Sequence, residues 1–396
     1  MAYREVTSVS WFERIKRSVG GVVVGLMLIV GMVVLLFWNE GRAVTSARSL
    51  AEGAGLVVTV GIDAIDAARE GTLVHVTGPV ETTHRPADRE FGIETAGLRL
   101  VRHAEMYQWI ESSKSETVTK VGGGQETVTT YTYAMDWSDS AEDSSRFKEP
   151  QGHQNPPMEV SGRSFQVPEA SLGAFRLGER VIGMIGGAET LSLSADQADA
   201  IQQAVGAGMK ATVSNDRIYL GFDPMQPRIG DYRISYEVVP LGPVSIVGRQ
   251  AGAGFEPFQT QAGDALLLVD AGTHSAEQMF SDAMTSNTII TWIVRVVGIL
   301  FLIVGFSLIM APLGVLGDVI PFIGSLVRMG TGIIAGVLGV LVGTATIALA
   351  WFWYRPLTAL IILAIGAAIA YGITRLGRKK QAGDVTPAAA PPVQPA

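Results

Sequence analysis

Four apolar stretches and one long polar segment divide the chain. The apolar stretches cover residues 19–38, 289–311, 329–354 and 357–374, and the polar segment covers 39–288. An α-helix rises 1.5 Å per residue, so about 20 apolar residues cross a bilayer core that is about 30 Å thick. We therefore predict four transmembrane helices, one N-terminal and three C-terminal, with a large water-facing domain between the first and the second.

The first apolar stretch has two interpretations. A signal peptide has an apolar region of about 7–15 residues and small residues at a cleavage site. Here the apolar region is longer, and Trp38, Asn39 and Glu40 follow it. These features favour an uncleaved membrane anchor.

Three shorter segments complete the predicted organisation. Residues 1–18 contain an amphipathic run, Trp11–Arg17, which is expected to lie in the cytoplasmic interface with its basic side toward anionic lipid. Residues 312–328 contain Asp318 and Pro321 and are too short and broken to cross, which predicts an interfacial or re-entrant loop. Residues 375–396 are rich in proline and alanine, which predicts a disordered cytoplasmic tail.

Basic residues in the short flanks of the spans predict the orientation. They precede the first and third spans and follow the fourth, which places both termini in the cytoplasm and residues 39–288 outside it. Arg295, about two turns into the second span, is expected to snorkel to the lipid headgroups. The residues expected to anchor the spans at the interface are Trp38, Trp292, Arg295, Trp351, Trp353, Tyr354 and Arg355.

Charge supports this division. Residues 39–288 hold 19 Lys and Arg against 33 Asp and Glu, a net charge of −14, and the rest of the chain holds 11 against 4, a net charge of +7. An acidic domain argues against binding nucleic acid, which requires a basic surface. The chain has no cysteine, which excludes disulfides and thiolate–zinc sites. The absence of cysteine together with abundant Ala, Gly and Arg favours a bacterial source.

Residues 39–288 read as a β-rich mixed domain, so the fold class is α+β. Two alternating runs flank Gly122–Gly124 and predict a β-hairpin, and the segments 210–220 and 232–250 are also strand-like. Ser194-Ala-Asp-Gln197 and Ser275-Ala-Glu-Gln278 are capping boxes that predict helix starts. The second of these helices is expected to run into the span at Ile289.

The run Arg102–Trp109 holds the strongest candidate for chemistry. On a strand, His103, Glu105, Tyr107 and Trp109 share one face, while Arg102 lies on the other. His103 and Glu105 offer two metal ligands, or a base and the group that orients it. The other histidines are scattered without metal-motif spacings, which favours a structural strand. We expect no cofactor and no metal.

Small residues recur at helical spacing in two spans. The candidates for close helix packing or an oligomer seam are Gly21, Gly25, Gly332, Gly336, Gly339 and Gly343. Such G-x-x-x-G pairs let helix backbones approach closely in lipid. Packing within one chain and self-association remain open alternatives.

Several strings together resemble a known family. They include NEGRA at 39–43, RHAEMYQWIE at 102–111, GHQNP at 152–156, SAEQMF at 275–280 and WFWYRPLTALII at 351–362. Their order and the four-span layout are similar to the LUMA family, also called transmembrane protein 43. The resemblance implies a four-pass protein with its large domain outside the cytoplasm. In animals, members of the family associate with themselves, with emerin and with lamins, and no enzymatic activity is attached to the family.

Three functions are weighed on this basis. The first is a non-enzymatic scaffold that organises membrane protein complexes through self-association, with membrane lipids, itself and other membrane proteins as partners. The alternatives are a module that binds lipid or senses the state of the envelope, and an enzyme acting on lipid or envelope substrates. A bacterial member would sit in the inner membrane with a periplasmic domain; a eukaryotic one would sit in the endoplasmic reticulum and inner nuclear membrane with a lumenal domain.

Overall fold

A computed structural model describes residues 2–194, 197–205, 208–357, 360–361, 364–366 and 368. The chain forms two compact units. Unit 1 combines residues Met1–Gly20, Thr45–Ile289 and Ala311–Gly330, and it holds the β domain. Unit 2 combines Gly21–Val44, Ile290–Met310 and the residues from Thr331 onward, and it holds the apolar parts of the long helices.

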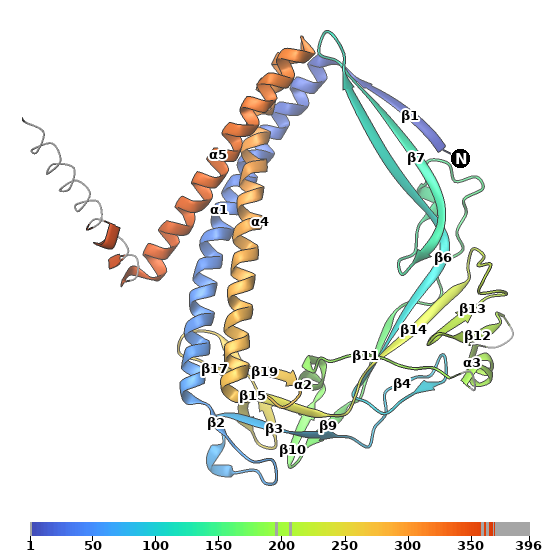
Figure 1. The fold of residues 1–396 in the computed structure, drawn as a ribbon, viewed down its shortest axis with the longest axis vertical. Coiled ribbons are helices and arrows are strands. Elements are labelled where there is room, and N and C mark those ends of the chain that lie inside the picture. The colour runs from blue at the N-terminus through green and yellow to red at the C-terminus, as the bar shows by residue number, and fades with distance from the viewer. Residues whose placement is uncertain are drawn as a thin grey trace, which may run out of the picture. The chain divides into compact units, whose positions relative to one another are not determined.

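Three helices are long and apolar enough to cross a membrane, among the residues described (Figure 1). They are α1 (Trp11–Leu56), α4 (Ala276–Gly317) and α5 (Pro321–Tyr354). The first three predicted spans lie inside these helices. Most of the predicted fourth span, 357–374, and all of the tail, 375–396, lie outside the described residues.

A serine side chain caps the N-terminus of two of these helices. The Ser10 side chain accepts a hydrogen bond from the Glu13 backbone at the start of α1, and Ser275 accepts one from Gln278 at the start of α4. Such a cap satisfies one of the backbone N–H groups that a helix start leaves free. The predicted helix start at Ser275 is thus confirmed, and α4 continues without a break through Ile289, as predicted.

Residues 312–328, predicted as an interfacial or re-entrant loop, are mostly helical, and their place relative to the membrane stays a prediction. Helix α4 continues to Gly317 despite Pro312, and α5 begins at Pro321, so the connection is a tight turn at 318–320. Proline is well tolerated in the first turn of a helix, where its missing N–H would have no partner anyway. Pro321 therefore starts a helix here.

An eight-stranded sheet forms one lobe of unit 1. Its strands run in the order β1-β7-β6-β14-β13-β12, with β8 beside β6 and β11 beside β14. Their bounds are β1 Ala2–Val9, β6 Arg99–Thr119, β7 Gln125–Ser138, β8 Arg163–Gln166, β11 Glu189–Thr190, β12 Ala211–Ser214, β13 Arg217–Leu220 and β14 Tyr232–Val239. Alternate residues of β6 and β14 face a buried core that includes Met106, Ile234 and Tyr236.

A seven-stranded sheet forms the other lobe. It runs in the order β10-β9-β3-β15-β16, with β2 beside β3 and β19 beside β15. Its strands are β2 Val58–Thr59, β3 Leu73–Glu81, β9 Glu169–Leu172, β10 Phe175–Gly178, β15 Pro243–Ala251, β16 Gly254–Glu256 and β19 Leu268–Ala271. A second core, which includes Val76, Phe175 and Ile246, lies against this sheet.

Short elements complete unit 1. The remaining strands form two small pairs, β4 (Ala87–Asp88) with β5 (Ile93–Glu94) and β17 (Phe258–Gln259) with β18 (Ala265–Leu266). The short helices are α2 (Glu179–Met184), α3 (Ala198–Val205), η1 (Ala67–Arg69) and η2 (Ser144–Arg146). The mixed, β-rich character predicted for this domain is confirmed.

Two predicted strand regions are hairpins. The β6–β7 hairpin was predicted around Gly122–Gly124, and the structure confirms it with Thr119 opposite Gln125. The segment 210–220, predicted as one strand-like run, folds into the hairpin β12–β13. Asn215 and Asp216 form its turn with φ of 51° and 58°. These two residue types tolerate left-handed backbone better than most, which explains the reversal.

The N-terminal segment differs from the prediction of an amphipathic segment over residues 1–18. Ala2–Val9 is a strand, β1, that pairs antiparallel with β7, from Ala2 opposite Thr132 to Val9 opposite Gln125. Tyr3, Val6 and Thr7 are residue types that are enriched in strands. Only the residues from Trp11 onward are helical.

Candidate functional site

A buried ion pair lies among the apolar helices of unit 2. Arg295 of α4 donates from Nε to Glu40 Oε1 at 2.6 Å and from Nη2 to Glu40 Oε2 at 2.7 Å. The Arg295 side chain is 12 % exposed and the Glu40 side chain is 3 % exposed. Two parallel charge-assisted bonds between a guanidinium and a carboxylate fix the orientation of both groups. The pair therefore ties α1 to α4.

Helix α5 joins this pair through an indole. Trp351 Nε1 donates to Glu40 Oε2 at 2.9 Å. The guanidinium of Arg295 also lies over the rings of Trp292, 4.8 Å from its centroid, and Trp351, 5.8 Å away. A cation over a tryptophan face is attracted by the ring quadrupole, more strongly where water is excluded. Glu40 thus receives hydrogen bonds from two other helices.

A second set of polar groups lies next to the pair. Asn39 Nδ2 donates to the Thr291 carbonyl at 3.4 Å, and Arg42 Nη2 donates to Thr291 Oγ1 at 3.0 Å. Arg42 also donates to Asn39 Oδ1 at 3.2 Å. The NEGRA string therefore supplies Asn39, Glu40 and Arg42 to one polar cluster at the α1–α4 contact.

Arg295, predicted to snorkel to lipid headgroups, instead directs its guanidinium to Glu40 within the helical unit. Trp351 and Tyr354 also have protein partners: Trp351 binds Glu40, and the Tyr354 ring packs against Phe37, with centroids 5.4 Å apart. Arg355 lies near the Trp351 ring, 5.9 Å from its centroid. Trp38, Trp292 and Trp353 present more than half of their surface, so their role as interface anchors stays a prediction.

The glycines of the spans fall into two groups. A Cβ on Gly25 would lie 2.6 Å from the Gly305 carbonyl, and one on Gly339 would lie 2.8 Å from the Ile303 nitrogen. Gly343 is equally close to Ile299, and Gly21 lies beside Leu308. These four glycines therefore pack α1 and α5 against α4, as intramolecular packing predicts. Around Gly332 and Gly336, by contrast, the described part of the chain places no atom within 4 Å of such a Cβ.

A second buried charge lies in unit 1, at the α4–α5 turn. Asp318 is fully buried, and it accepts hydrogen bonds from Arg14, at 2.5 Å, and from Arg328. Arg14 Nη1 also donates to the Gly123 carbonyl at the tip of the β6–β7 hairpin. The Gly122 N–H donates to the Val319 carbonyl at 3.1 Å. The start of α1, the helical turn and the hairpin tip therefore meet at Asp318.

The motif strand β6 has the two faces that the sequence predicts. His103, Glu105, Tyr107 and Trp109 lie on its accessible face, and Arg102 lies on the buried one. Glu105 pairs with Arg233 rather than with His103. His103 lies 3.4 Å from Glu237, and both of these side chains are about half exposed. The expected pairing of His103 with Glu105 as ligands or as base and orienter is therefore not formed.

Arg102 is the centre of a buried polar network. It donates from Nη1 to Asp88 at 2.8 Å and to Glu90 at 2.7 Å, and from Nε to the Ser161 carbonyl at 2.9 Å. The Tyr236 hydroxyl donates to Asp88 at 2.8 Å. Burial and the neighbouring Asp88 carboxylate raise the pKa of Tyr236, so this hydroxyl stays protonated as a donor. The network therefore holds Asp88 and Glu90 against strands β6 and β14 of the eight-stranded sheet.

The GHQNP string docks onto the same strand. Asn155 accepts from the Trp109 N–H at 2.7 Å and donates to the Trp109 carbonyl at 2.9 Å. His153 stacks on Tyr133, with ring centroids 4.0 Å apart, and meets Trp109 edge-on. Burial and the hydrogen bond to Glu111 raise the pKa of Tyr133 to about 12. These contacts give the GHQNP string and the RHAEMYQWIE string a structural role.

The remaining histidines are separately held. Burial lowers the pKa of His75, whose ring contacts Thr59 and the His274 carbonyl. His84 lies 3.7 Å from Glu169, and both are exposed. Among the residues that the structure describes, no three His, Asp or Glu side chains gather where they would hold a metal ion.

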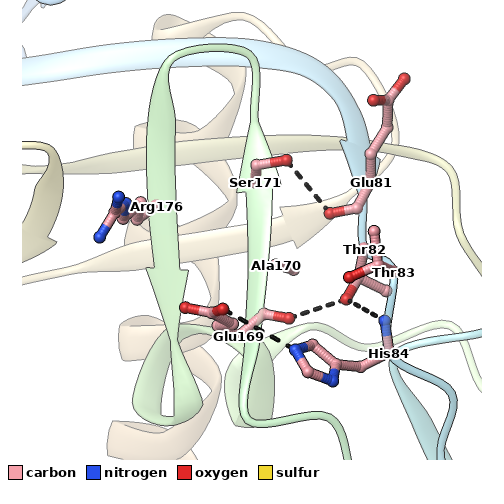
Figure 2. Close-up of a pocket in the computed structure, with 8 residues that line it drawn as sticks. All are labelled: Glu81, Thr82, Thr83, His84, Glu169, Ala170, Ser171 and Arg176. Atoms are coloured by element: carbon pink, nitrogen blue, oxygen red, sulfur yellow. Dashed lines mark hydrogen bonds and ion pairs between the residues drawn. The ribbon is translucent and has the colours of Figure 1, made fainter.

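A polar hollow of about 380 Å³ lies beside His84, and Figure 2 shows the residues that line it. Thr82 Oγ1 donates to the Glu169 carbonyl at 2.9 Å, and Ser171 Oγ donates to the Glu81 carbonyl at 3.3 Å. These bonds hold the end of β3 against β9. The Glu81 carboxylate and the Arg176 guanidinium point away from His84 (Figure 2), so the charged groups do not converge on one point.

Sequence reasoning missed Glu40 and Asp318 as partners of buried arginines. Glu40 was assigned to the outer domain because it follows Trp38, the predicted end of the span. A usable signal was present: Glu40 lies two residues past one span, and Arg295 lies two turns into the next. In two antiparallel neighbouring helices, both positions lie near the same end of the pair. Asp318 was interpreted only as a break in an apolar run.

Comparisons with known proteins agree on one family. The family model described as Transmembrane protein 43 matches residues 106–356. Transmembrane protein 43 of Homo sapiens is 33 % identical over 386 residues, which cover 93 % of this chain and 94 % of the relative. The Mus musculus protein is 34 % identical, with 89 % of each chain covered, and the Drosophila melanogaster homolog is 28 % identical, with 89 % of this chain and 93 % of the relative covered. No solved structure matches the chain.

Proposed function

Because the chain belongs to the transmembrane protein 43 family, we propose that it is a non-enzymatic membrane protein that organises membrane protein complexes by self-association. Its helices are built as a fixed frame: the Glu40–Arg295 pair and Trp351 join α1, α4 and α5 through hydrogen bonds. Buried charges with paired partners stabilise a single arrangement of helices. Such a frame suits a scaffold.

One observation carries the proposal of self-association. Gly332 and Gly336 lie on α5 without close neighbours among the described residues, although Gly339 and Gly343 on the same helix are packed against α4. Ile333 and Val337 beside them are more than half exposed. Small residues flanked by branched apolar ones form helix–helix seams in lipid. We assign this surface, Gly332 and Gly336 with Ile333 and Val337, to contact with a second copy or another membrane protein.

Replacing Gly332 and Gly336 together with leucine is expected to turn an oligomer into a monomer without loss of thermal stability. Added side chains hold the two backbones apart, while the packing against α4 is unchanged. The measurement is the mass of the protein in mild detergent. Gly31→Leu, at an open position of α1, serves as the control and should leave the mass unchanged. An oligomer that survives both leucines would refute the proposed seam.

We also propose the orientation indicated by the basic flanks: termini and the α4–α5 turn in the cytoplasm, β domain on the opposite side. The contact of Arg14 with Asp318 supports one part of this, because it brings the start of α1 and the turn to the same place. The pairing of β1 with β7 and the bond from Gly122 to Val319 oppose the other part. A polar hairpin does not pass through lipid. The proposed orientation therefore requires that, in a bilayer, the contacts of the hairpin tip with Arg14 and Val319 break.

Single cysteines decide the orientation, since the chain has none of its own. We expect Val121→Cys at the hairpin tip and Gln151→Cys in the β domain to react with a membrane-impermeant maleimide on intact cells. Lys16→Cys should react only after the membrane is opened. Reaction of Val121→Cys together with Lys16→Cys, and not with Gln151→Cys, would overturn the proposed orientation.

A further inference from the structure

A groove of about 730 Å³ lies on unit 1 between the end of α1 and the start of α4. Its apolar lining comes from both helices: Ala54, Val57, Ala276, Phe280 and Met284. Serine and threonine hydroxyls, among them those of Ser281 and Thr285, line the rest. Its size falls in the range of small-molecule sites, about 300–1,000 Å³.

The floor of the groove is held firmly by the core. Phe280 is only 2 % exposed and belongs to a buried cluster with Leu50, Leu266 and Met279. It lies so close to α1 that a Cβ on Gly53 would be 2.9 Å from its ring. The groove is therefore a preformed feature of the α1–α4 contact.

The groove ends next to the predicted second span. Its last lining residue, Thr288, is followed by Ile289, the first residue of the predicted span, and the Ile289 side chain is 55 % exposed. An open apolar groove that begins where the bilayer begins is accessible to acyl chains, which enter it without crossing water. A lipid chain is thus the occupant that the position favours.

The charges select a class of headgroup. One acidic side chain, Glu277, lines the groove in the described part of the chain. A second acidic residue, Asp282, lies on the same helix between the lining residues Ser281 and Met284. An acidic rim attracts a headgroup ammonium and repels a lipid with a net negative charge. The Ser281 hydroxyl can donate to an ester or phosphate oxygen, whereas Thr285 Oγ1 and Thr288 Oγ1 already donate to the Ser281 and Met284 carbonyls.

We propose that this groove binds one acyl chain of an amine-bearing phospholipid, with the chain on Phe280 and Met284 and the ammonium beside Glu277. The site extends the proposed scaffold role to lipid recognition at the junction of the β domain and the membrane. It does not depend on self-association, since every residue that forms the groove lies within one chain.

The test uses the full chain in phosphatidylglycerol nanodiscs with small amounts of spin-labelled lipid, because a phosphatidylcholine host would itself present an ammonium to Glu277. An environment-sensitive fluorophore is attached to Ser281→Cys in the groove, or to Ser286→Cys, which lies outside the lining and nearer to the membrane in sequence. We expect chain-labelled phosphatidylethanolamine to quench the probe at 281 more strongly than the probe at 286. Labelled phosphatidylglycerol should quench both to the same small extent.

Three variants separate the parts of the proposal. Met284→Trp and Ala54→Leu fill the groove from the two helices, and each should abolish the excess quenching at 281. Glu277→Gln should keep quenching by the chain and lose the preference for ethanolamine over glycerol headgroups. Equal quenching at both probes, or excess quenching that both filling variants leave unchanged, would overturn the proposal. Repeating the measurement with Gly332→Leu/Gly336→Leu shows whether the result is independent of the oligomer.

Discussion

Replacement of Glu40 by glutamine is expected to destabilise the helical unit by about 3–5 kcal/mol, the usual cost of leaving a buried charge without its partner. Arg295 is only 12 % exposed and has both of its strongest bonds to this carboxylate. Glutamine keeps one acceptor oxygen in place of two, so Arg295 and Trp351 then compete for a single acceptor. The measurement is the midpoint of thermal or denaturant unfolding of the purified protein in detergent.

The controls for Glu40 distinguish a charge effect from loss of packing. Arg295→Met should cost a similar amount, but Glu40→Gln/Arg295→Met should cost much less than the sum, because no charge then remains unpaired. Trp351→Phe removes one hydrogen bond and should cost about 1–3 kcal/mol, the range for leaving a buried group unsatisfied. Additive effects of the two single replacements would show that the pair contributes nothing as a pair.

The membrane part shows what a hydropathy pattern can predict and what it cannot. Length and apolarity located the first three predicted spans within long helices, because crossing a bilayer depends on properties that neighbouring residues share. Arg295 was misplaced, because its partner Glu40 comes from a helix 255 positions away in the chain. Hydropathy carries no information on which turn of one helix faces which turn of another, so only packing reveals that a costly charge is neutralised.

The β domain shows the same boundary between local and distant information. The two faces of β6 were predictable, because alternation along a strand is local. The partners were not: His103 faces Glu237 and Glu105 binds Arg233, through the pairing of β6 with β14. The register of strands 130 residues apart depends on the whole sheet. The strand β1 was missed because its eight residues are too few to show a decisive period beside the apolar span that follows.

Arg102 is expected to give the second large effect, this time in the β domain. Arg102→Leu leaves Asp88, which is 1 % exposed, with Tyr236 as its remaining side-chain donor in the described part of the chain. The expected loss is about 3–5 kcal/mol of unfolding free energy, since an uncompensated charge stays in the core. Unfolding of this domain can be followed by the fluorescence of Trp109 and Trp137, in a variant whose other tryptophans are replaced by phenylalanine.

Arg233→Leu is the matched control. Arg233 lies on β14 and pairs with Glu105, which is on the accessible face of β6, the strand that carries Arg102. Arg233 and Glu105 are each about one-third exposed, and ion pairs that water reaches contribute about 0–1 kcal/mol. The charge change and the side-chain truncation are the same in both variants, so the difference between them reports the buried network of Arg102 with its larger set of hydrogen bonds. If Arg102→Leu were no more harmful than Arg233→Leu, the buried network would not stabilise the domain, and the RHAEMYQWIE strand would need another explanation.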